Sequence, residues 1–63
     1  MSAYHIIGDQ DTVLGYRFAG VSGTVANTPE QAREAFAEAT RETKDGVLLI
    51  TEAVEDMLQE QVT

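Results

Sequence analysis

Apolar residues along the chain fall into short runs and periodic stripes that alternate from one end to the other. The run Tyr4–Ile7 is apolar and β-favouring, and Gly8 follows it directly, so we expect a short strand there. Leu14, Phe18 and Val21 then recur at spacings of four and three residues. That spacing predicts a short helix with one apolar stripe.

Polar and glycine residues mark where this helix begins and ends. Asp9 or Asp11 is a suitable N-cap, because a carboxylate accepts from the free backbone amides of the first turn. Gly20 is a suitable stop, because glycine adopts the left-handed conformation that ends many helices. The run Gly23–Ala26 then predicts a weak second strand, which Asn27 ends.

The second helix has the clearest start signal in the chain. Thr28 supplies an N-cap hydroxyl, Pro29 occupies the first helical position, and Gln31 supplies an amide three residues after the cap. The residues that recur on one face are Ala32, Ala35, Phe36 and Ala39. Phe36 is the one large residue on this stripe, so we expect it in the core, with a cost of about 3–5 kcal/mol for Phe36→Ala. The segment Lys44–Gly46 ends the helix.

A continuous apolar run, Val47–Ile50, predicts a parallel strand that is covered on both faces. Thr51 follows as the N-cap of a third helix, with acids in its first turn. The expected buried stripe of that helix is Val54, Met57, Leu58 and Val62.

The predicted element order is therefore β-α-β-α-β-α. This order is typical of an α/β fold with a small Rossmann-like parallel sheet, right-handed crossovers and helices on both faces. In doubly wound sheets of this kind, the expected strand order is 2-1-3.

Composition narrows the possible partners. The chain has 63 residues and a net charge of −7, with four Lys and Arg, so a nucleic acid or an anionic membrane surface is an unfavourable partner. The absence of cysteine excludes disulfides, thiolate zinc sites and cysteine nucleophiles. A chain of this length is expected to form one domain, residues 1–63. The sequence has no signal segment and no apolar run of membrane-spanning length, so we expect it in the cytoplasm.

Asp9 and Asp11 follow the first strand, where open α/β sheets usually bind ligands. One interpretation is a phosphate- or metal-responsive domain of the receiver kind. Such a site also needs an Asp after the third strand and a later Lys, whereas Thr51 follows Ile50 and no Lys follows Lys44. The favoured interpretation is that one Asp caps the helix and the other is solvated.

Other candidate chemistry is sparse. His5 is the only histidine and lies within the first strand, where we expect a packed or edge residue and no catalytic role. An acidic stripe runs along the second helix at Glu30, Glu34, Glu38 and Glu42. We expect it to be a solvated outer face, with a docking face for a basic partner as the alternative. The sequence contains no serine elbow, HExxH motif, Walker loop or dinucleotide fingerprint, so it predicts no catalytic, cofactor-binding or metal site.

The stretch IGDQDTVLGYRFAGV, residues 7–21, resembles the N-terminal signature of the F subunit of the archaeal and bacterial V-type (A-type) rotary ATPases. That family typically has an apolar strand, Gly-Asp-x-Asp-Thr/Ser and then Gly-Phe-Arg-Leu-Ala-Gly-Val. The matching residues are Gly8, Asp9, Asp11, Thr12, Gly15, Arg17, Ala19, Gly20 and Val21, with Tyr16 and Phe18 as close replacements. The likeness continues through TPEQAREAF (28–36) and GVLLITEAV (46–54).

The resemblance implies a non-catalytic component of the central stalk, peripheral to the membrane. It implies binding to the coiled-coil D subunit, rotation within the head of A and B subunits, and contact with the C subunit. Ion transport, of protons or sodium, and ATP chemistry then belong to other subunits, and no cofactor is expected here. We expect Asp9, Asp11, Arg17 and Phe18 to serve shape and docking.

The family pattern continues with a fourth strand and a C-terminal helical tail, which this sequence lacks, so we expect a truncated or partial F subunit. Without the fourth strand, Val47–Ile50 is an apolar edge strand. Exposed apolar edges pair readily with other chains, so we also expect self-association through this strand.

Overall fold

The computed structural model of the chain describes residues 4–42 and 46–60. Strands and helices alternate, as the hydrophobic pattern predicts. The elements are β1 (Tyr4–Gly8), α1 (Gln10–Phe18), β2 (Ser22–Val25), α2 (Pro29–Glu42), β3 (Val47–Ile50) and α3 (Glu52–Gln59). The predicted α/β class is therefore confirmed.

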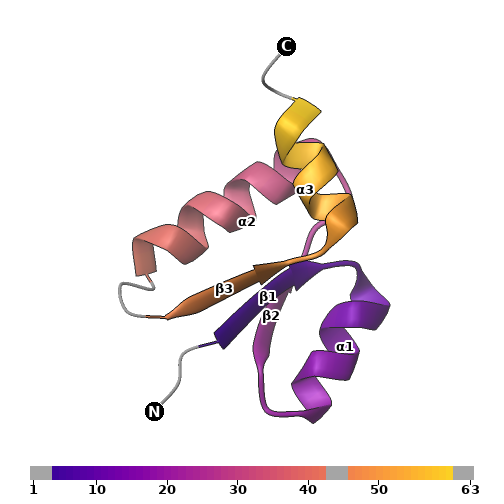
Figure 1. The fold of residues 1–63 in the computed structure, drawn as a ribbon, viewed down its shortest axis with the longest axis vertical. Helices are drawn as coiled ribbons and strands as arrows, with labels where there is room; N and C mark the ends of the chain where they lie inside the picture. Colours follow the sequence, from indigo (N-terminus) through magenta and orange to yellow (C-terminus); the bar gives the residue numbers. More distant parts are fainter. Residues whose placement is uncertain (1–3, 43–45, 61–63) are drawn as a thin grey trace.

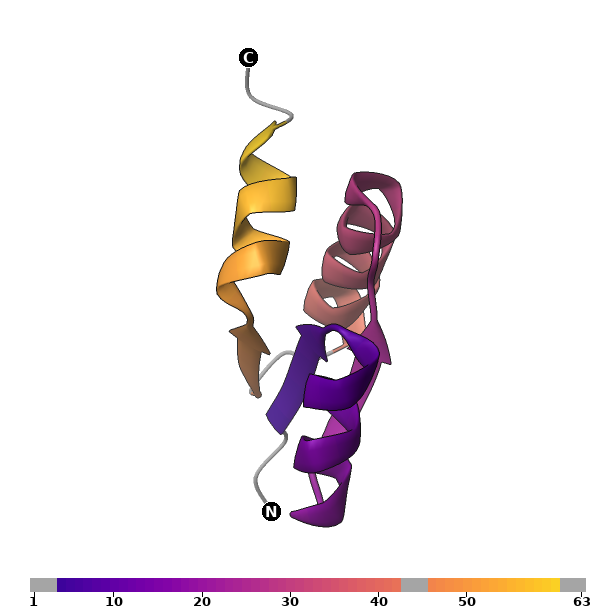
Figure 2. The same ribbon diagram turned by 90° about the vertical axis from the view of Figure 1, so that its right-hand side faces the viewer.

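The three strands form one parallel sheet in the order β2-β1-β3, which confirms the predicted order. Ile6 of the central strand pairs with Gly23 on one side and with Leu49 on the other. Figure 1 shows α1 on one face of this sheet and α2 and α3 on the opposite face. The turned view in Figure 2 shows β1 between the other two strands.

The main core lies between the sheet and the pair α2 and α3. Its buried members are Ile7, Ala26, Ala32, Ala35, Ala39 and Val54, with Leu48, Ile50, Met57 and Leu58 packed against them. Ile7 and Val54 are the largest fully buried side chains. On the other face of the sheet, Ile6 of β1 and Val13 of α1 are buried.

Local capping signals give the predicted helix boundaries. The Val54 amide donates to Thr51 Oγ1 at 3.1 Å, and the Gln31 amide donates to Thr28 Oγ1 at 3.1 Å. Gly20 has φ of 85° and follows α1, where its amide and that of Val21 donate back to the last turn. This pattern is a Schellman motif, for which glycine is favoured.

The predicted apolar stripe of α1 is wrong. Leu14 is 49% exposed and Phe18 is 85% exposed, while Val21 lies beyond the helix. Val13, at 4% exposure, is the buried residue of α1 instead. The reason is a hollow over β2: a Cβ built on Gly23 would lie only 2.7 Å from Val13 Cγ1, so the valine occupies the space that glycine leaves.

The prediction that Phe36 lies in the core is also wrong. Phe36 is 39% exposed, whereas Ala32, Ala35 and Ala39 are buried. At 3.6 residues per turn, Phe36 lies roughly 70° around the helix from the middle of the alanine stripe. The small alanines let α2 approach the sheet closely, and the bulky ring stays at the flank. The predicted positions Lys44, Asp45 and Val62 lie outside the described residues.

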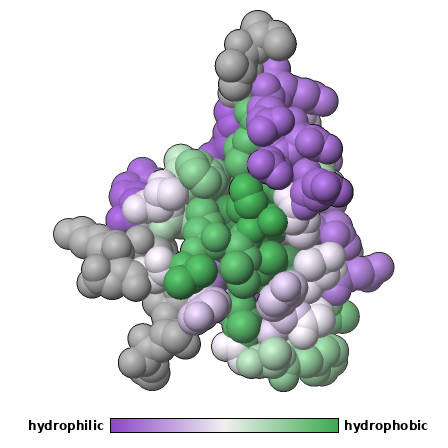
Figure 3. Space-filling model, viewed as in Figure 1, coloured by the Kyte–Doolittle hydropathy of each residue, from purple (hydrophilic) through white to green (hydrophobic). Residues whose placement is uncertain are grey.

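β3 is less covered than its sequence predicts. Val47 is 44% exposed, and the rest of the strand is half-buried. Figure 3 shows hydrophobic residues gathered in one patch across the middle of this face of the molecule. The cause is the placement of α1, which packs against β2 and β1 and leaves β3 uncovered on the α1 side of the sheet. Tyr4, the partner of Val47, is accordingly 45% exposed.

Candidate docking surface

The turn after β1 places the first of the predicted site residues at the start of α1. Asp9 is the N-cap: its Oδ1 accepts from the Thr12 hydroxyl at 2.7 Å, and its Oδ2 accepts from the Thr12 amide at 3.2 Å. The Thr12 hydroxyl, with the Thr12 amide second, holds the pKa of the Asp9 carboxyl below its usual value of 3.8. The prediction that Asp9 or Asp11 caps the helix is therefore confirmed, and the cap is Asp9.

This cap predicts a pH-dependent stability. Because the pKa of Asp9 is lowered by folding, its carboxylate stabilises the native state above the unfolded pKa, and that contribution disappears as pH falls through the folded pKa. The wild type should therefore melt at a higher temperature than Asp9→Asn near neutral pH, and the two melting temperatures should converge in acid. Thermal melts across the acid range test this. A difference that is unchanged at the most acid pH would contradict it.

Asp11 lies in the first turn of α1 and is exposed. In residues 4–42 and 46–60, no group of three or more His, Cys, Asp or Glu residues is placed to hold a metal ion. Both Asp9 oxygens accept from Thr12 within the helix cap. The arrangement of these two acids is thus that of a helix start.

Gly8 lets the ends of β1 and β3 come close together. A Cβ on Gly8 would lie 2.7 Å from Thr51 Cγ2. The Thr51 amide donates to the Ile7 carbonyl oxygen at 3.2 Å, which fixes this approach. As a result, α1 and α3 begin from neighbouring points at the same edge of the sheet.

Arg17 and Phe18 lie at the opposite end of α1, in its last turn. At 1.5 Å rise per residue, about 12 Å of helix separates Asp9 from Arg17. The structure therefore does not bring the four predicted docking residues together as one cluster. Phe18, at 85% exposure, is the most exposed large hydrophobic residue among those described.

Arg17 also lines a groove of about 410 Å³ between α1 and β2. The lining residues are Gln10, Val13, Leu14, Arg17, Gly23, Thr24 and Val25. Leu14 and Val25 are 49% and 39% exposed, so apolar surface and one cation share the groove. The sequence did not predict Leu14 or Val25 as surface residues, because both fit an apolar stripe or strand.

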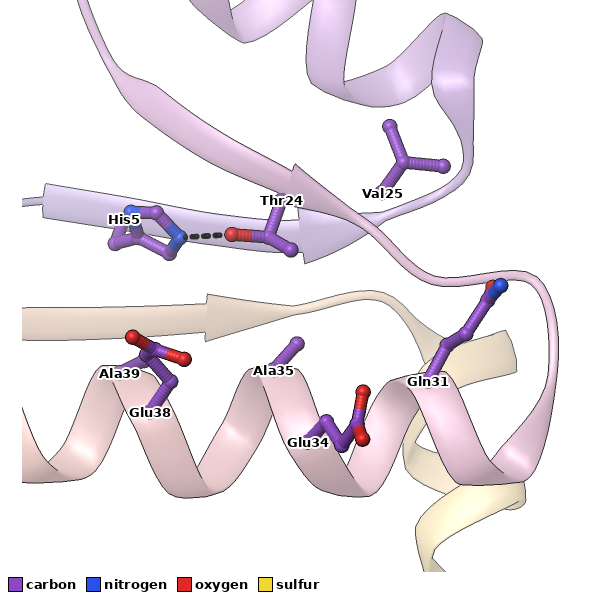
Figure 4. Close-up of a pocket in the computed structure, with 8 residues that line it drawn as sticks. All are labelled: His5, Thr24, Val25, Gln31, Glu34, Ala35, Glu38 and Ala39. Atoms are coloured by element: carbon purple, nitrogen blue, oxygen red, sulfur yellow. Dashed lines mark hydrogen bonds between the residues drawn. The ribbon is translucent and has the colours of Figure 1, made fainter.

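A second cavity, of about 470 Å³, lies on the other face of the sheet beside β2. Figure 4 shows His5 and Thr24 on the strands and Glu34, Ala35 and Glu38 on α2 around it. The remaining lining residues are Val25, Gln31 and Ala39.

His5 is held in place by two hydroxyl groups. Its Nδ1 lies 2.9 Å from Ser22 Oγ, and its Nε2 lies 2.8 Å from Thr24 Oγ1. Both hydroxyls belong to β2, so the histidine ties the central strand to its neighbour. The prediction of a packed or edge residue is confirmed.

The acidic stripe of α2 has the exposure that the sequence predicts. Glu30, Glu34 and Glu38 are exposed, and the Glu42 side chain lies outside the described part. Glu34 and Glu38 additionally face the cavity beside β2. The acidic stripe of α2 is therefore exposed to solvent, and part of it also lines the cavity beside the edge strand β2. Among the described helices, none is long and apolar enough to cross a membrane.

Comparison with known proteins gives consistent matches. A family model described as ATP synthase (F/14-kDa) subunit matches residues 5–63. The F subunit of the A-type ATP synthase of Methanothermobacter thermautotrophicus is 40% identical over 58 residues, covering 87% of the chain and 52% of that protein. The F subunit of the A-type ATP synthase of Methanococcus maripaludis S2 is 30% identical over 59 residues, covering 92% of the chain and 60% of that protein. The chain thus spans between about half and three fifths of these relatives. No solved structure gives a significant match.

Proposed function

The chain belongs to the ATP synthase (F/14-kDa) subunit family, and from this membership we propose that it is a non-catalytic component of the central stalk of an A-type (V-type) rotary ATPase. In this role it binds the coiled-coil D subunit and turns with it inside the head of A and B subunits. It also contacts the C subunit, so that ATP hydrolysis or synthesis in the head is coupled to proton or sodium transport. Its place is peripheral to the membrane, on the cytoplasmic side.

The observation that carries this proposal is the family match, which extends over nearly the whole chain. The character of the surface supports a binding role. Helix α1 exposes large apolar side chains to solvent at Leu14, Tyr16 and Phe18. Exposed apolar patches are typical of protein interfaces. Arg17 adds a cation to this surface in a chain with net charge −7. We therefore assign Arg17 and Phe18 to direct docking, and Asp9 and Asp11 to the shape and charge of the helix start.

A binding titration with the D subunit from the same organism tests the proposal. We expect the chain to bind the D subunit and to show no ATP hydrolysis of its own after head subunits are removed. Arg17→Glu should weaken binding about tenfold, because it places a negative charge on the docking face. Arg41→Glu is the matched control, since Arg41 is also an exposed arginine in the last turn of its helix. It should bind as the wild type does.

Circular dichroism of both variants keeps the comparison interpretable, because it shows whether each retains its fold. No binding of the wild-type chain to the D subunit, or ATP hydrolysis intrinsic to the pure chain, would overturn the proposed function. Equal binding by the wild type and Arg17→Glu would remove Arg17 from the interface.

The uncovered side of β3 leads to a prediction for the 63-residue chain alone. Its open edge and the exposed Val47 and Tyr4 offer a template for pairing with another copy. We expect the chain to self-associate as concentration rises, and Val47→Lys to reduce that association because edge lysines oppose strand pairing. Light scattering over a concentration series measures this. A strictly monomeric wild type would contradict the prediction.

A further inference from the structure

β2 presents an open backbone edge on the side away from β1 (Figure 2). The Ala26 amide, just after β2, donates toward β1, to the Gly8 carbonyl oxygen at 2.9 Å. Backbone amides point to alternate sides along a strand, so the amides of Val25 and Gly23 point toward the open side. Within the described residues, neither of these two amides has a hydrogen-bond partner.

The two cavities described above lie on the two faces of this same strand. The groove on the α1 side is lined by Val13, Leu14 and Val25, with Arg17 along it. The cavity on the α2 side is lined by Thr24, with Glu34 and Glu38 across from it (Figure 4). The surface on the α1 side of β2 therefore combines apolar side chains with one positive charge. The surface on the α2 side combines a polar side chain with two negative charges.

A strand that pairs with an edge directs alternate side chains to the two faces of the sheet. Strand addition at an open edge is a recurrent mode of peptide recognition, in which backbone hydrogen bonds give affinity and the alternating side chains give specificity. The residues that line the two cavities beside β2 therefore determine which side chains an added strand should have. Arg17 forms no ion pair with another described residue, so it is available to a carboxylate.

We propose that β2 accepts an extended segment of the D subunit, outside its coiled-coil part, as an additional strand of the sheet. The side chains of that segment on the α1 side are apolar, with an Asp or Glu against Arg17. Those on the α2 side include Lys or Arg against Glu34 and Glu38. This inference rests on the proposed function, because it describes how the chain is held by a partner in the complex.

A second copy of the chain does not fit this description. Pairing through either edge strand of a second copy, β2 (Ser22–Val25) or β3 (Val47–Ile50), would offer only uncharged residues. Such a strand would leave Arg17, Glu34 and Glu38 without opposite charges. The charge pattern therefore favours a different protein as the occupant.

Hydrogen exchange of the ¹⁵N-labelled chain, free and bound to the D subunit, tests the backbone part of the inference. Added-strand pairing predicts that exchange at the Gly23 and Val25 amides slows at least about tenfold on binding. The Ala26 amide is already bonded to Gly8 and should change less.

Two pairs of variants test the same surface independently. Val25→Pro removes an amide that faces the open side, and proline is tolerated at that kind of edge position, so the fold should persist while binding weakens at least about tenfold. Val25→Thr keeps the amide and should bind as the wild type does. Glu38→Lys should weaken binding, whereas Asp56→Lys, on the exposed surface of α3, should not.

The outcomes separate this inference from the function on which it rests. If the D subunit binds but Gly23 and Val25 remain unprotected and Val25→Pro binds normally, strand addition is overturned and the proposed function stands. If the wild-type chain does not bind the D subunit at all, both are overturned. Loss of structure in Val25→Pro leaves the exchange measurement and the Glu38 and Asp56 pair to decide.

Discussion

Replacing Ile7 with alanine should remove a large share of the free energy of unfolding of the chain. Ile7 is fully buried in the central strand, in the middle of the core between the sheet and the α2–α3 pair. Removing such a side chain typically costs about 2–5 kcal/mol, since it deletes buried methyl groups and leaves a cavity. A domain of this size has a total stability of only about 3–9 kcal/mol. Urea denaturation followed by circular dichroism measures the loss.

Phe36→Ala is the informative comparison for Ile7→Ala. The sequence alone predicts a cost of about 3–5 kcal/mol for Phe36→Ala. The 39% exposure of Phe36 predicts a smaller cost, below about 2 kcal/mol. Equal costs for the two substitutions, or a larger cost for Phe36→Ala, would contradict the placement of α2 on the sheet.

Replacing Gly23 with alanine should destabilise the chain by about 1–3 kcal/mol through overpacking. A Cβ at this position would lie 2.7 Å from Val13 Cγ1 and 2.8 Å from Ile6 Cγ2, and also 3.2 Å from the Ile6 carbonyl oxygen. Relief of the Val13 contact requires α1 to move away from β2, whereas the two Ile6 contacts lie within the sheet and persist. The same movement would widen the groove that Arg17 lines.

Gly15→Ala is the matched control for Gly23→Ala. A Cβ at Gly15 meets no atom within 4 Å, and the residue lies inside α1. Alanine should therefore stabilise the helix by about 0.5–1 kcal/mol, as glycine is a weak helix former. Opposite signs for the two substitutions are expected in chemical denaturation. Similar effects of both would contradict the close packing of α1 on β2.

Local signals explain why so much of the fold could be predicted. The caps at Thr28 and Thr51 and the stop at Gly20 act within one helical turn, so sequence alone places these boundaries. The alternation of elements predicts a parallel sheet, and 2-1-3 is the order expected of doubly wound sheets of this kind. These features do not depend on which side chains meet across the sheet.

The faces of the helices could not be predicted in the same way. α1 has nine residues, and apolar side chains occur at Val13, Leu14, Tyr16 and Phe18, on more than one side of it. The choice of Val13 depends on Gly23, a contact made only in the folded chain. Phe36 was misplaced for a related reason, since the close approach of three alanines to the sheet excludes a large ring.

The candidate site was predicted only in part. The sequence predicts a local cap at Asp9 or Asp11 without choosing between them, and Arg17 was selected through a family resemblance. The two cavities beside β2 are lined by residues of that strand and of α1 or α2. These residues lie far apart in the sequence, so the spacing of residues along the chain does not predict that they are neighbours. His5 illustrates the same limit, because its two hydroxyl partners lie 17 and 19 residues away.

Affinity purification from the source cell gives the most direct test of whether this chain works in the central stalk. The chain carries an N-terminal tag, and mass spectrometry identifies the proteins that remain bound after washing. We predict that the D, A and B subunits of the ATPase are recovered together and that their recovery depends on Arg17. Recovery of the chain without the D subunit, or with an unrelated set of partners, would contradict the proposed role.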